Sequence, residues 1–538
     1  MSENYSRIRL ILLILLALLV IVTRYESILS FFGFEATEKQ RNITKLEETL
    51  EVVDKYYVDD VEWKPLIESS INGLLKSLDP HSVYFTSTEA ELNEENFQGK
   101  YQGIGIHFDV LDGYITVISV IPGSPSEKAG LRAGDKIVKI DGKSAYDITT
   151  AEVPKKLKGP SGSEVLITVQ REGLEEPFDV PIIRDEIPIY TIYTYFMVDE
   201  EIGYIWVNRF ANTTENELEH ALIELEKSGM KKLLLDLRDN GGGFLQQAVK
   251  MVGKFISGHH KVVYTRGRLT QFDQDYYTDE FGKSINRDYP LVILINEGSA
   301  SASEIVAGAI QDYDRGLIAG QTSFGKGLVQ NEFILNDESR LRLTISKYYT
   351  PSGRLIQRPY KGVEPEDYYY HQIDSLNNHV SDDTTSRPVY YTQKGRPVYG
   401  GGGINPDVEI PFQSGPVSGN MMNQFWSKRI FFEAATAYAQ KHPELKKDFN
   451  RFLKSFRVTD SLIELVRKTA LSRNLNFTNE EFKADRDFIA NRIKAEIARS
   501  LWGMNQYYQI ILQYDNQFHE ALKLFPKAEE IMNLKQAA

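Results

Sequence analysis

Two residues, Ser301 and Lys326, carry side chains that together can cleave a peptide bond. Ser301 follows the apolar run 291–295, which is typical of a buried parallel strand, and it precedes apolar residues at helical spacing. We therefore expect it in the first turn of a helix. Unpaired N–H groups and the helix dipole favour an anion there, so the N–H of Ala302 could bind an oxyanion. The alternative is that these serines only cap the helix.

Lys326 has a glycine on each side, and this allows a tight turn with room for a reacting group. A lysine acts as a general base only when neutral, so its pKa must fall from ~10.4 to near neutrality, as burial can cause. We expect Lys326 to lie desolvated beside Ser301, to remove its proton and to return that proton to the leaving amine. A solvated loop lysine is the alternative interpretation.

A third segment, Asp239 to Gly243, follows the apolar run 233–235 and ends in three glycines. Consecutive glycines after a strand expose backbone N–H groups, and we select Gly243 as a second oxyanion donor. A phosphate-binding turn is the competing interpretation. It is weak because neither the dinucleotide fingerprint nor the Walker lysine and hydroxyl stand at their spacing.

Seven segments, in order along roughly two thirds of the chain, resemble the C-terminal processing peptidases, which are also called tail-specific proteases. These segments are 78–84, 101–106, 236–243, 298–304, 324–330, 349–354 and 403–407. The resemblance implies that Ser301, rather than Ser299 or Ser303, is the nucleophile of a serine endopeptidase. It also implies that Lys326 is the base.

The same resemblance implies three supporting roles in the reaction. Gln330 would orient the lysine, and the N–H groups of Gly243 and Ala302 would bind the oxyanion. Residues four apart on a straight strand lie roughly 13 Å apart, so a contact between Lys326 and Gln330 requires a turn between them. Gly325 and Gly327 could provide it.

A compact β-rich segment resembles a PDZ domain, with an alternating strand at 114–118 followed by the turn and strand pattern of 122–142. In that fold a glycine-rich loop presents backbone N–H groups to a terminal carboxylate, and the peptide adds to a sheet edge. The corresponding loop here consists of Tyr101, Gln102, Gly103, Ile104, Gly105 and Ile106. The resemblance thus implies cleavage of proteins and peptides near free C-termini that the PDZ domain holds. Whether that domain gates the protease or only delivers substrate stays open.

The order of the segments predicts five regions and a composite fold. They are a cytoplasmic tail with a membrane anchor or signal (1–37), an N-terminal helical region (38–98), the PDZ domain (99–185), the protease core (186–412) and a helical C-terminal extension (413–538). Strands and helices alternate in the core, at 202–207, 215–227, 232–237, 244–256, 262–265, 291–295 and 303–311, as is typical of an α/β fold. The resemblance implies a crotonase-like spiral of ββα units.

Composition excludes several classes of function. The chain of 538 residues has no cysteine, which excludes disulfides, thiolate nucleophiles and cysteine metal sites. A net charge of −13 argues against a nucleic-acid partner. The nine histidines show no ligand spacing, so we expect neither a metal nor a cofactor.

The N-terminus predicts a location in the bacterial cell envelope. Arg7 and Arg9 precede an apolar run from Leu10 to Val22. Its length matches a signal peptide, but no cleavage site is evident, so we expect an uncleaved inner-membrane anchor, with a cleaved signal as the alternative. Positive charge before the run places the catalytic part outside, facing the periplasm.

Two further segments lie outside the resemblance. The polar, tyrosine-rich stretch 360–399 separates two family motifs, and we interpret it as an inert surface loop, with a lid or a partner site as alternatives. Beyond 412, helices are expected at 421–440, 462–471, 480–502 and 506–525, and Thr478 to Glu481 has the form of a capping box. Packing against the protease and a homo-oligomer contact are both open for these helices.

Three other functions compete with that of a peptidase. The first is a catalytically silent PDZ scaffold, and the second is a lipid carrier, because some relatives of the protease core are carriers. Neither would require the Ser301 and Lys326 pair. A Ser-His-Asp hydrolase would need a Gly-x-Ser-x-Gly elbow, which the chain lacks.

Overall fold

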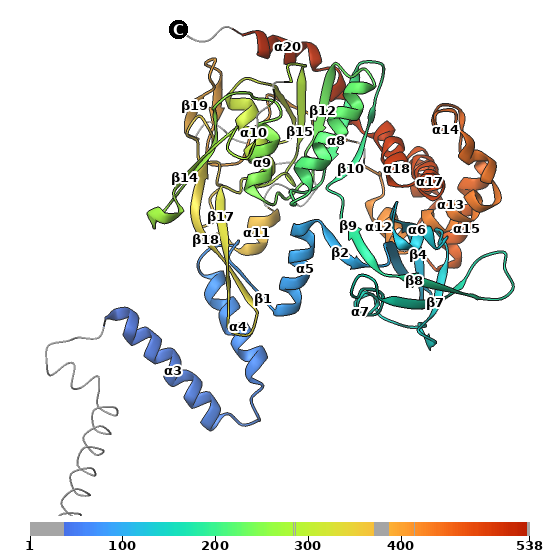
Figure 1. Ribbon diagram of the computed structural model, residues 1–538, viewed down its shortest axis with the longest axis horizontal. Coiled ribbons are helices and arrows are strands. Elements are labelled where there is room, and N and C mark those ends of the chain that lie inside the picture. Colours follow the sequence, from blue (N-terminus) through green and yellow to red (C-terminus); the bar gives the residue numbers. More distant parts are fainter. Residues whose placement is uncertain (1–36, 283–284, 286, 371–386, 414, 535–538) are drawn as a thin grey trace, which may run out of the picture. The chain divides into compact units, whose positions relative to one another are not determined.

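The computed structural model describes the chain except for residues 1–36, 283–284, 286, 371–386, 414 and 535–538 (Figure 1). It divides into two compact units, Met1–Ser77 and Leu78–Ala538. The first unit contains helices α3 (Glu38–Tyr56) and α4 (Trp63–Lys76). The predicted anchor at 10–22 lies outside the described residues, and within them no helix combines the length and apolar character that a membrane crossing needs.

A six-stranded sheet in the order β10-β11-β12-β15-β16-β21 forms the centre of the second unit. Its strands are β10 (Ile192–Met197), β11 (Ile202–Val207), β12 (Lys232–Asp236), β15 (Leu291–Ile295), β16 (Leu317–Gly320) and β21 (Val408–Glu409). From β11 to β21 every pairing is parallel, and all residues of β15 are buried. Apolar runs buried on both faces are what parallel strands require, so the strands predicted at 202–207, 232–237 and 291–295 are confirmed.

Helices cover both faces of this sheet. Leu235 and Ile293 face a core that includes side chains of α8 (Thr214–Lys227), α9 (Leu245–Val252) and α10 (Ala302–Asp312), which Figure 1 shows beside β12 and β15. Leu234 and Val292 face the other way, toward α19 (Asn516–Leu522) and α20 (Phe525–Asn533). The end of the chain thus completes the core of the predicted α/β domain.

A second sheet lies beside this core and includes parts of the segments 78–84 and 324–330. Its strands are β1 (Val83–Phe85), β13 (Lys261–Gly267), β14 (Gln274–Tyr277), β17 (Leu328–Ile334) and β18 (Arg340–Tyr349). The path runs β1-β18-β13-β14, with β17 also paired to β18. The segment 78–84, which leads into β1, is thereby fixed next to β18. The crotonase-like spiral that the resemblance implies stays a prediction.

The predicted PDZ region folds around its own apolar core, which includes Ile115, Ile137 and Val165. Its main sheet runs β3-β4-β5-β7-β8, and β6 pairs with β5. The elements are β2 (Lys100–Gly103), β3 (Ile106–Leu111), β4 (Tyr114–Val120), α6 (Pro125–Lys128), β5 (Lys136–Ile140), β6 (Lys143–Ser144), α7 (Val153–Leu157), β7 (Glu164–Gln170), β8 (Phe178–Ile183) and β9 (Asp185–Pro188). Strand β3 ends the sheet, so one of its edges has no partner among these strands.

The C-terminal extension is helical, as predicted, and the helix expected at 462–471 is confirmed, but the other three expected helices are each divided. Its helices are α12 (Gly419–Ser427), α13 (Ile430–Lys441), α14 (Phe449–Ser455), α15 (Asp460–Ser472), α16 (Asn479–Ala484), α17 (Arg486–Leu501) and α18 (Met504–Ile511). The single helix expected at 421–440 is wrong, because Arg429 adopts a φ of 53° and separates α12 from α13. The expected helices at 480–502 and 506–525 are each divided as well. The capping box is confirmed, with Glu481 N–H donating to Thr478 Oγ1 at 3.1 Å.

Candidate active site

Three neighbouring strands bring the three predicted loops together. Strands β12, β15 and β16 are parallel and adjacent, so their carboxyl ends lie at one edge of the sheet. The glycine loop follows β12, the serine loop follows β15 and the lysine loop follows β16. Crevices at this edge are where open α/β sheets bind ligands. Segments far apart in sequence therefore lie together at this edge and form one candidate site.

Ser301 stands at the start of α10 with a backbone conformation that is rare for a non-glycine residue, at a φ of 54°. Such strain persists only where surrounding contacts enforce it, and it is concentrated at functional sites. The neighbouring serines have structural partners, because Ser299 Oγ donates to Leu237 O and Ser303 Oγ donates to Asn240 O, each at 2.8 Å. Both of those serines are fully buried, whereas Ser301 is partly exposed. The choice of Ser301 as the candidate nucleophile therefore agrees with the geometry.

A buried carboxylate joins the serine loop to the lysine loop. Glu304 Oε2 accepts the backbone N–H of Ser301 at 2.8 Å and that of Lys326 at 2.9 Å. Its Oε1 accepts Gly325 N–H at 2.7 Å and Ser323 Oγ–H at 2.5 Å. Burial raises the pKa of Glu304, and these four donors oppose the rise. Glu304 thus fixes the backbones of both candidate catalytic residues at one point.

Lys326 lies in surroundings that lower its pKa. Burial, with a further contribution from the positive charge of Arg342, lowers its pKa to about 8, although the carboxylates of Glu304 and Asp79 act in the opposite direction. A sizeable fraction of neutral amine is therefore present at mildly alkaline pH, as a general base requires. In the part of the chain that the structure describes, no hydrogen bond joins Lys326 Nζ to Ser301 Oγ. Catalytic hydrogen bonds are often long before substrate binds.

The glycine loop lies directly against the serine. A Cβ on Gly242 would meet Ala300 O at 2.7 Å and Ser301 Cβ at 2.8 Å, and one on Gly243 would meet Phe210 O at 2.0 Å. Only glycine fits so close an approach, and both residues have positive φ angles. Among the described residues, no acceptor is found for the N–H groups of Gly243 and Ala302. Both predicted oxyanion donors are therefore available on two touching loops.

Gln330 lies on β17, and its contacts differ from the expected one. Its Nε2 donates to Thr344 Oγ1 at 3.3 Å, and Thr344 Oγ1 donates to Asp79 Oδ1 at 3.1 Å. No hydrogen bond from Gln330 to Lys326 is found in the described segments. The chain turns at Gly325, where φ is 86°, before β17 begins at Leu328. The role of Gln330 in orienting the lysine stays a prediction.

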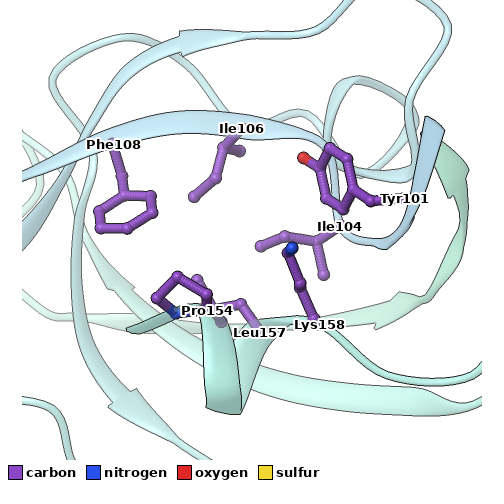
Figure 2. A pocket seen from close by; sticks show the side chains of 7 residues that line it. All are labelled: Tyr101, Ile104, Ile106, Phe108, Pro154, Leu157 and Lys158. Atoms are coloured by element: carbon purple, nitrogen blue, oxygen red, sulfur yellow. The ribbon is translucent and has the colours of Figure 1, made fainter. Parts of the chain in front are cut away.

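The PDZ region contains an apolar cavity of about 80 Å³ between β3 and α7 (Figure 2). Its lining residues are Tyr101, Ile104, Ile106, Phe108, Pro154, Leu157 and Lys158. Burial raises the pKa of Tyr101 to about 12, and the Lys158 ammonium lies 5.0 Å from the centre of that ring.

The loop that precedes the cavity leaves backbone donors available. Gly105 has a φ of 83°, and within the described chain no acceptor is found for the N–H groups of Ile104 and Gly105. The predicted carboxylate loop therefore opens onto this cavity. Gln102 and Gly103 belong to β2 and pair with Glu186 and Asp185 of β9, so these two residues of the predicted loop form part of a strand pair.

Sequence reasoning missed three residues around the site. Glu304 had a signal, because Ser301-x-x-Glu304 has the form of a capping box, yet its link to Lys326 could not be read from that pattern. His81 and Tyr368 contact each other across 287 positions of sequence, at 2.9 Å between Nε2 and the hydroxyl oxygen. Helix α11 (Pro365–Tyr370) carries Tyr368, which is 2% exposed. The interpretation of 360–399 as an inert surface loop is therefore wrong for this residue.

Comparisons with known proteins match the regions just described. The model of peptidase family S41 matches residues 201–368, and that of the PDZ domain matches 116–171. The model described as the activating protease CtpB N-terminal domain matches 29–88, and a family of unknown function matches 421–503. The carboxy-terminal-processing protease of Bartonella bacilliformis is 38% identical over 321 residues, which are 59% of this chain and 73% of that protein. This chain belongs to the C-terminal processing peptidases.

Other relatives of this peptidase carry similar descriptions. A probable CtpA-like serine protease of Staphylococcus aureus is 37% identical over 336 residues, which are 62% of this chain and 66% of that protein. Among solved structures, the photosystem II D1 C-terminal processing protease matches 68% of this chain and 86% of its own, at 27% identity and a TM-score of 0.35. The chain is a serine-type peptidase with a PDZ domain.

Proposed function

We propose that this peptidase cleaves extracytoplasmic proteins near their C-termini with Ser301 as nucleophile and Lys326 as general base. The observation that carries the proposal is the shared Glu304 carboxylate, which binds the backbone N–H groups of both residues within 2.9 Å. The lowered pKa of Lys326 supports the role of base. A scaffold that only held peptide tails would need neither feature.

The proposed reaction has two steps at the same carbonyl carbon. Neutral Lys326 accepts the proton of Ser301 Oγ as this oxygen attacks the peptide carbonyl, and the N–H groups of Gly243 and Ala302 donate to the oxyanion. The C–N bond then breaks, the lysine gives its proton to the leaving amine, and an ester remains on Ser301. Water gives a proton to the again neutral lysine as it attacks the ester. The C–O bond to Ser301 Oγ then breaks, the lysine returns that proton to Ser301 Oγ, and the shortened protein leaves with a new carboxylate.

The PDZ region is proposed to hold the free C-terminus of the substrate. The N–H groups of Ile104 and Gly105 can donate to the carboxylate, and the unpartnered edge of β3 can accept the tail as an added strand. The apolar lining of the cavity favours an aliphatic or aromatic last side chain, since Ile106, Phe108 and Leu157 offer no polar partner there.

A location in the bacterial cell envelope, with the catalytic part outside an inner-membrane anchor, forms part of the proposal. The apolar run from Leu10 to Val22 behind Arg7 and Arg9 supports it. A tag placed after Ala538 should be digested by protease added to spheroplasts while a cytoplasmic marker survives. Protection of the tag until lysis would contradict this location.

The test of the proposed function compares the full-length protein with Ser301→Ala and Lys326→Ala. Each is incubated with an unfolded protein that ends in an apolar residue with a free carboxylate, and mass spectrometry identifies the products. We expect cleavage by the parent, and a loss of at least about 10³-fold in rate for both variants. Activity retained by either variant would overturn the assignment of the catalytic pair.

A further inference from the structure

Helix α11 places Tyr368 against the loop that carries Lys326. The Tyr368 ring meets Phe324 edge-on, with 5.7 Å between ring centres, and it meets His81 in the same manner at 5.4 Å. The guanidinium of Arg358 lies 4.2 Å from the centre of the Tyr368 ring and 3.9 Å from that of Phe324. Tyr368 is therefore part of a packed cluster of aromatic rings and one cation.

The Tyr368 hydroxyl connects two buried polar side chains. Gln357 Nε2 donates to the hydroxyl oxygen at 3.0 Å, so the hydroxyl hydrogen is free to point at His81 Nε2, 2.9 Å away. Burial and the nearby charge of Lys326 lower the pKa of His81 to about 3, so that its ring is neutral and can accept the hydrogen. Gln357 Oε1 in turn accepts the N–H of Gly327 at 2.8 Å.

Both neighbours of Lys326 are thereby tied to Tyr368. Gly327 is held by Gln357, whose amide donates to the Tyr368 hydroxyl. Gly325 O accepts the N–H of Arg358 at 3.0 Å, and the Arg358 guanidinium donates to Tyr368 O and stacks on its ring. The two glycines allow the loop many backbone conformations, and these contacts restrict that range.

We infer that Tyr368 is a positioning residue that holds the Lys326 loop in its catalytic geometry through Gln357 and Arg358. The inference rests on the proposed Ser301 and Lys326 pair and adds a residue from a stretch that lies between two family motifs. Tyr368 itself need not touch substrate. Its hydroxyl fixes the side chain that binds Gly327, and its ring fixes the side chain that binds Gly325.

The matched control for Tyr368 is its neighbour Tyr369, on the same helix. Tyr369 is 49% exposed, and its hydroxyl donates to Pro80 O at 2.7 Å rather than to a residue that binds the lysine loop. Tyr368→Phe and Tyr369→Phe delete the same atom. Both full-length variants are assayed for kcat and KM on one peptide substrate, together with the pH profile of kcat/KM and the thermal unfolding midpoint.

We expect Tyr368→Phe to lower kcat by about tenfold, with KM unchanged, because misplacement of a catalytic group affects the chemical step. The titratable and charged groups that act on the charge of Lys326 are Arg342, Glu304, Asp79 and His81. The variant removes a hydrogen bond to His81, but it changes the charge of none of these groups because the His81 ring is already neutral. The acid limb of the pH profile should therefore stay in place. Tyr369→Phe should match the parent.

Each other result would overturn the inference. An unchanged kcat, an equal loss in Tyr369→Phe, or a loss explained by a lower unfolding midpoint would show that Tyr368 does not position the loop. A displaced acid limb would show that it acts on the charge of the lysine instead. If Lys326→Ala stays active, the proposed function itself is contradicted. If Lys326→Ala is inactive and Tyr368→Phe has the kcat of the parent, only the inference about Tyr368 is contradicted.

Discussion

At the scale of single residues, the proposed reaction depends on the pKa of Lys326. Burial and Arg342 lower the pKa of Lys326 to about 8, and Glu304 and Asp79 limit this decrease. Only the neutral amine can act as base. The reaction rate should therefore rise with pH up to about pH 8 and fall roughly tenfold per pH unit below that value. The acid limb of kcat/KM thus reports the environment of this lysine.

Arg342→Gln should move this limb to higher pH by up to about one pH unit, because a positive charge that favours the neutral lysine is removed. Arg340→Gln is the matched control. Both arginines bind Glu332, at 2.7 Å and 3.0 Å, but only Arg342 contributes to the pKa of Lys326. Measurement of kcat/KM between pH 6 and 10 checks the shift, and Arg342→Lys should restore the parent profile. The same displacement in both glutamine variants would contradict a specific effect of Arg342.

At the scale of elements, the glycine loop after β12 shapes the proposed oxyanion site. Gly242 has a φ of 94°, and a Cβ there would come within 3.0 Å of Ala300 O, Ser301 Cβ and Ala302 N. Gly242→Ala should therefore push the two oxyanion donors apart and lower kcat by about 10²-fold or more. Gly241→Ala is the control, since a Cβ on Gly241 meets nothing within 4 Å. Equal activity of the two variants would show that the loop does not form the oxyanion site.

Elements with strong local signals could be predicted from the sequence, and their relative placement could be predicted in part. The run Leu291–Ile295 identified a buried strand, and three parallel strands then bring Gly243, Ser301 and Lys326 to one edge. The break between α12 and α13 could not be predicted, because Arg429 adopts a positive φ that its own sequence does not favour. Tyr368 was missed for another reason, since its partner His81 is 287 positions away.

At the scale of the whole molecule, the proposed function assigns substrate binding and bond cleavage to separate parts of the chain. All residues that line the apolar cavity lie between Tyr101 and Lys158, whereas the candidate catalytic pair lies at 301 and 326. A tail held in the cavity therefore contributes binding energy without touching the reacting carbonyl. Interactions of that kind act on KM when they are the same in the ground state and the transition state.

Two substrate peptides that differ only in a C-terminal carboxylate or amide test this division. We expect the amide to raise KM by about tenfold or more with kcat nearly unchanged, because the N–H groups of Ile104 and Gly105 lose a charged acceptor. Equal KM values would contradict binding of tails by the PDZ domain. A short uncleaved peptide with a free carboxylate, added in trans, then separates the two open roles of that domain. It should stimulate cleavage of the amide if the PDZ domain gates the active site, and it should only inhibit cleavage of the free acid if the domain delivers substrate.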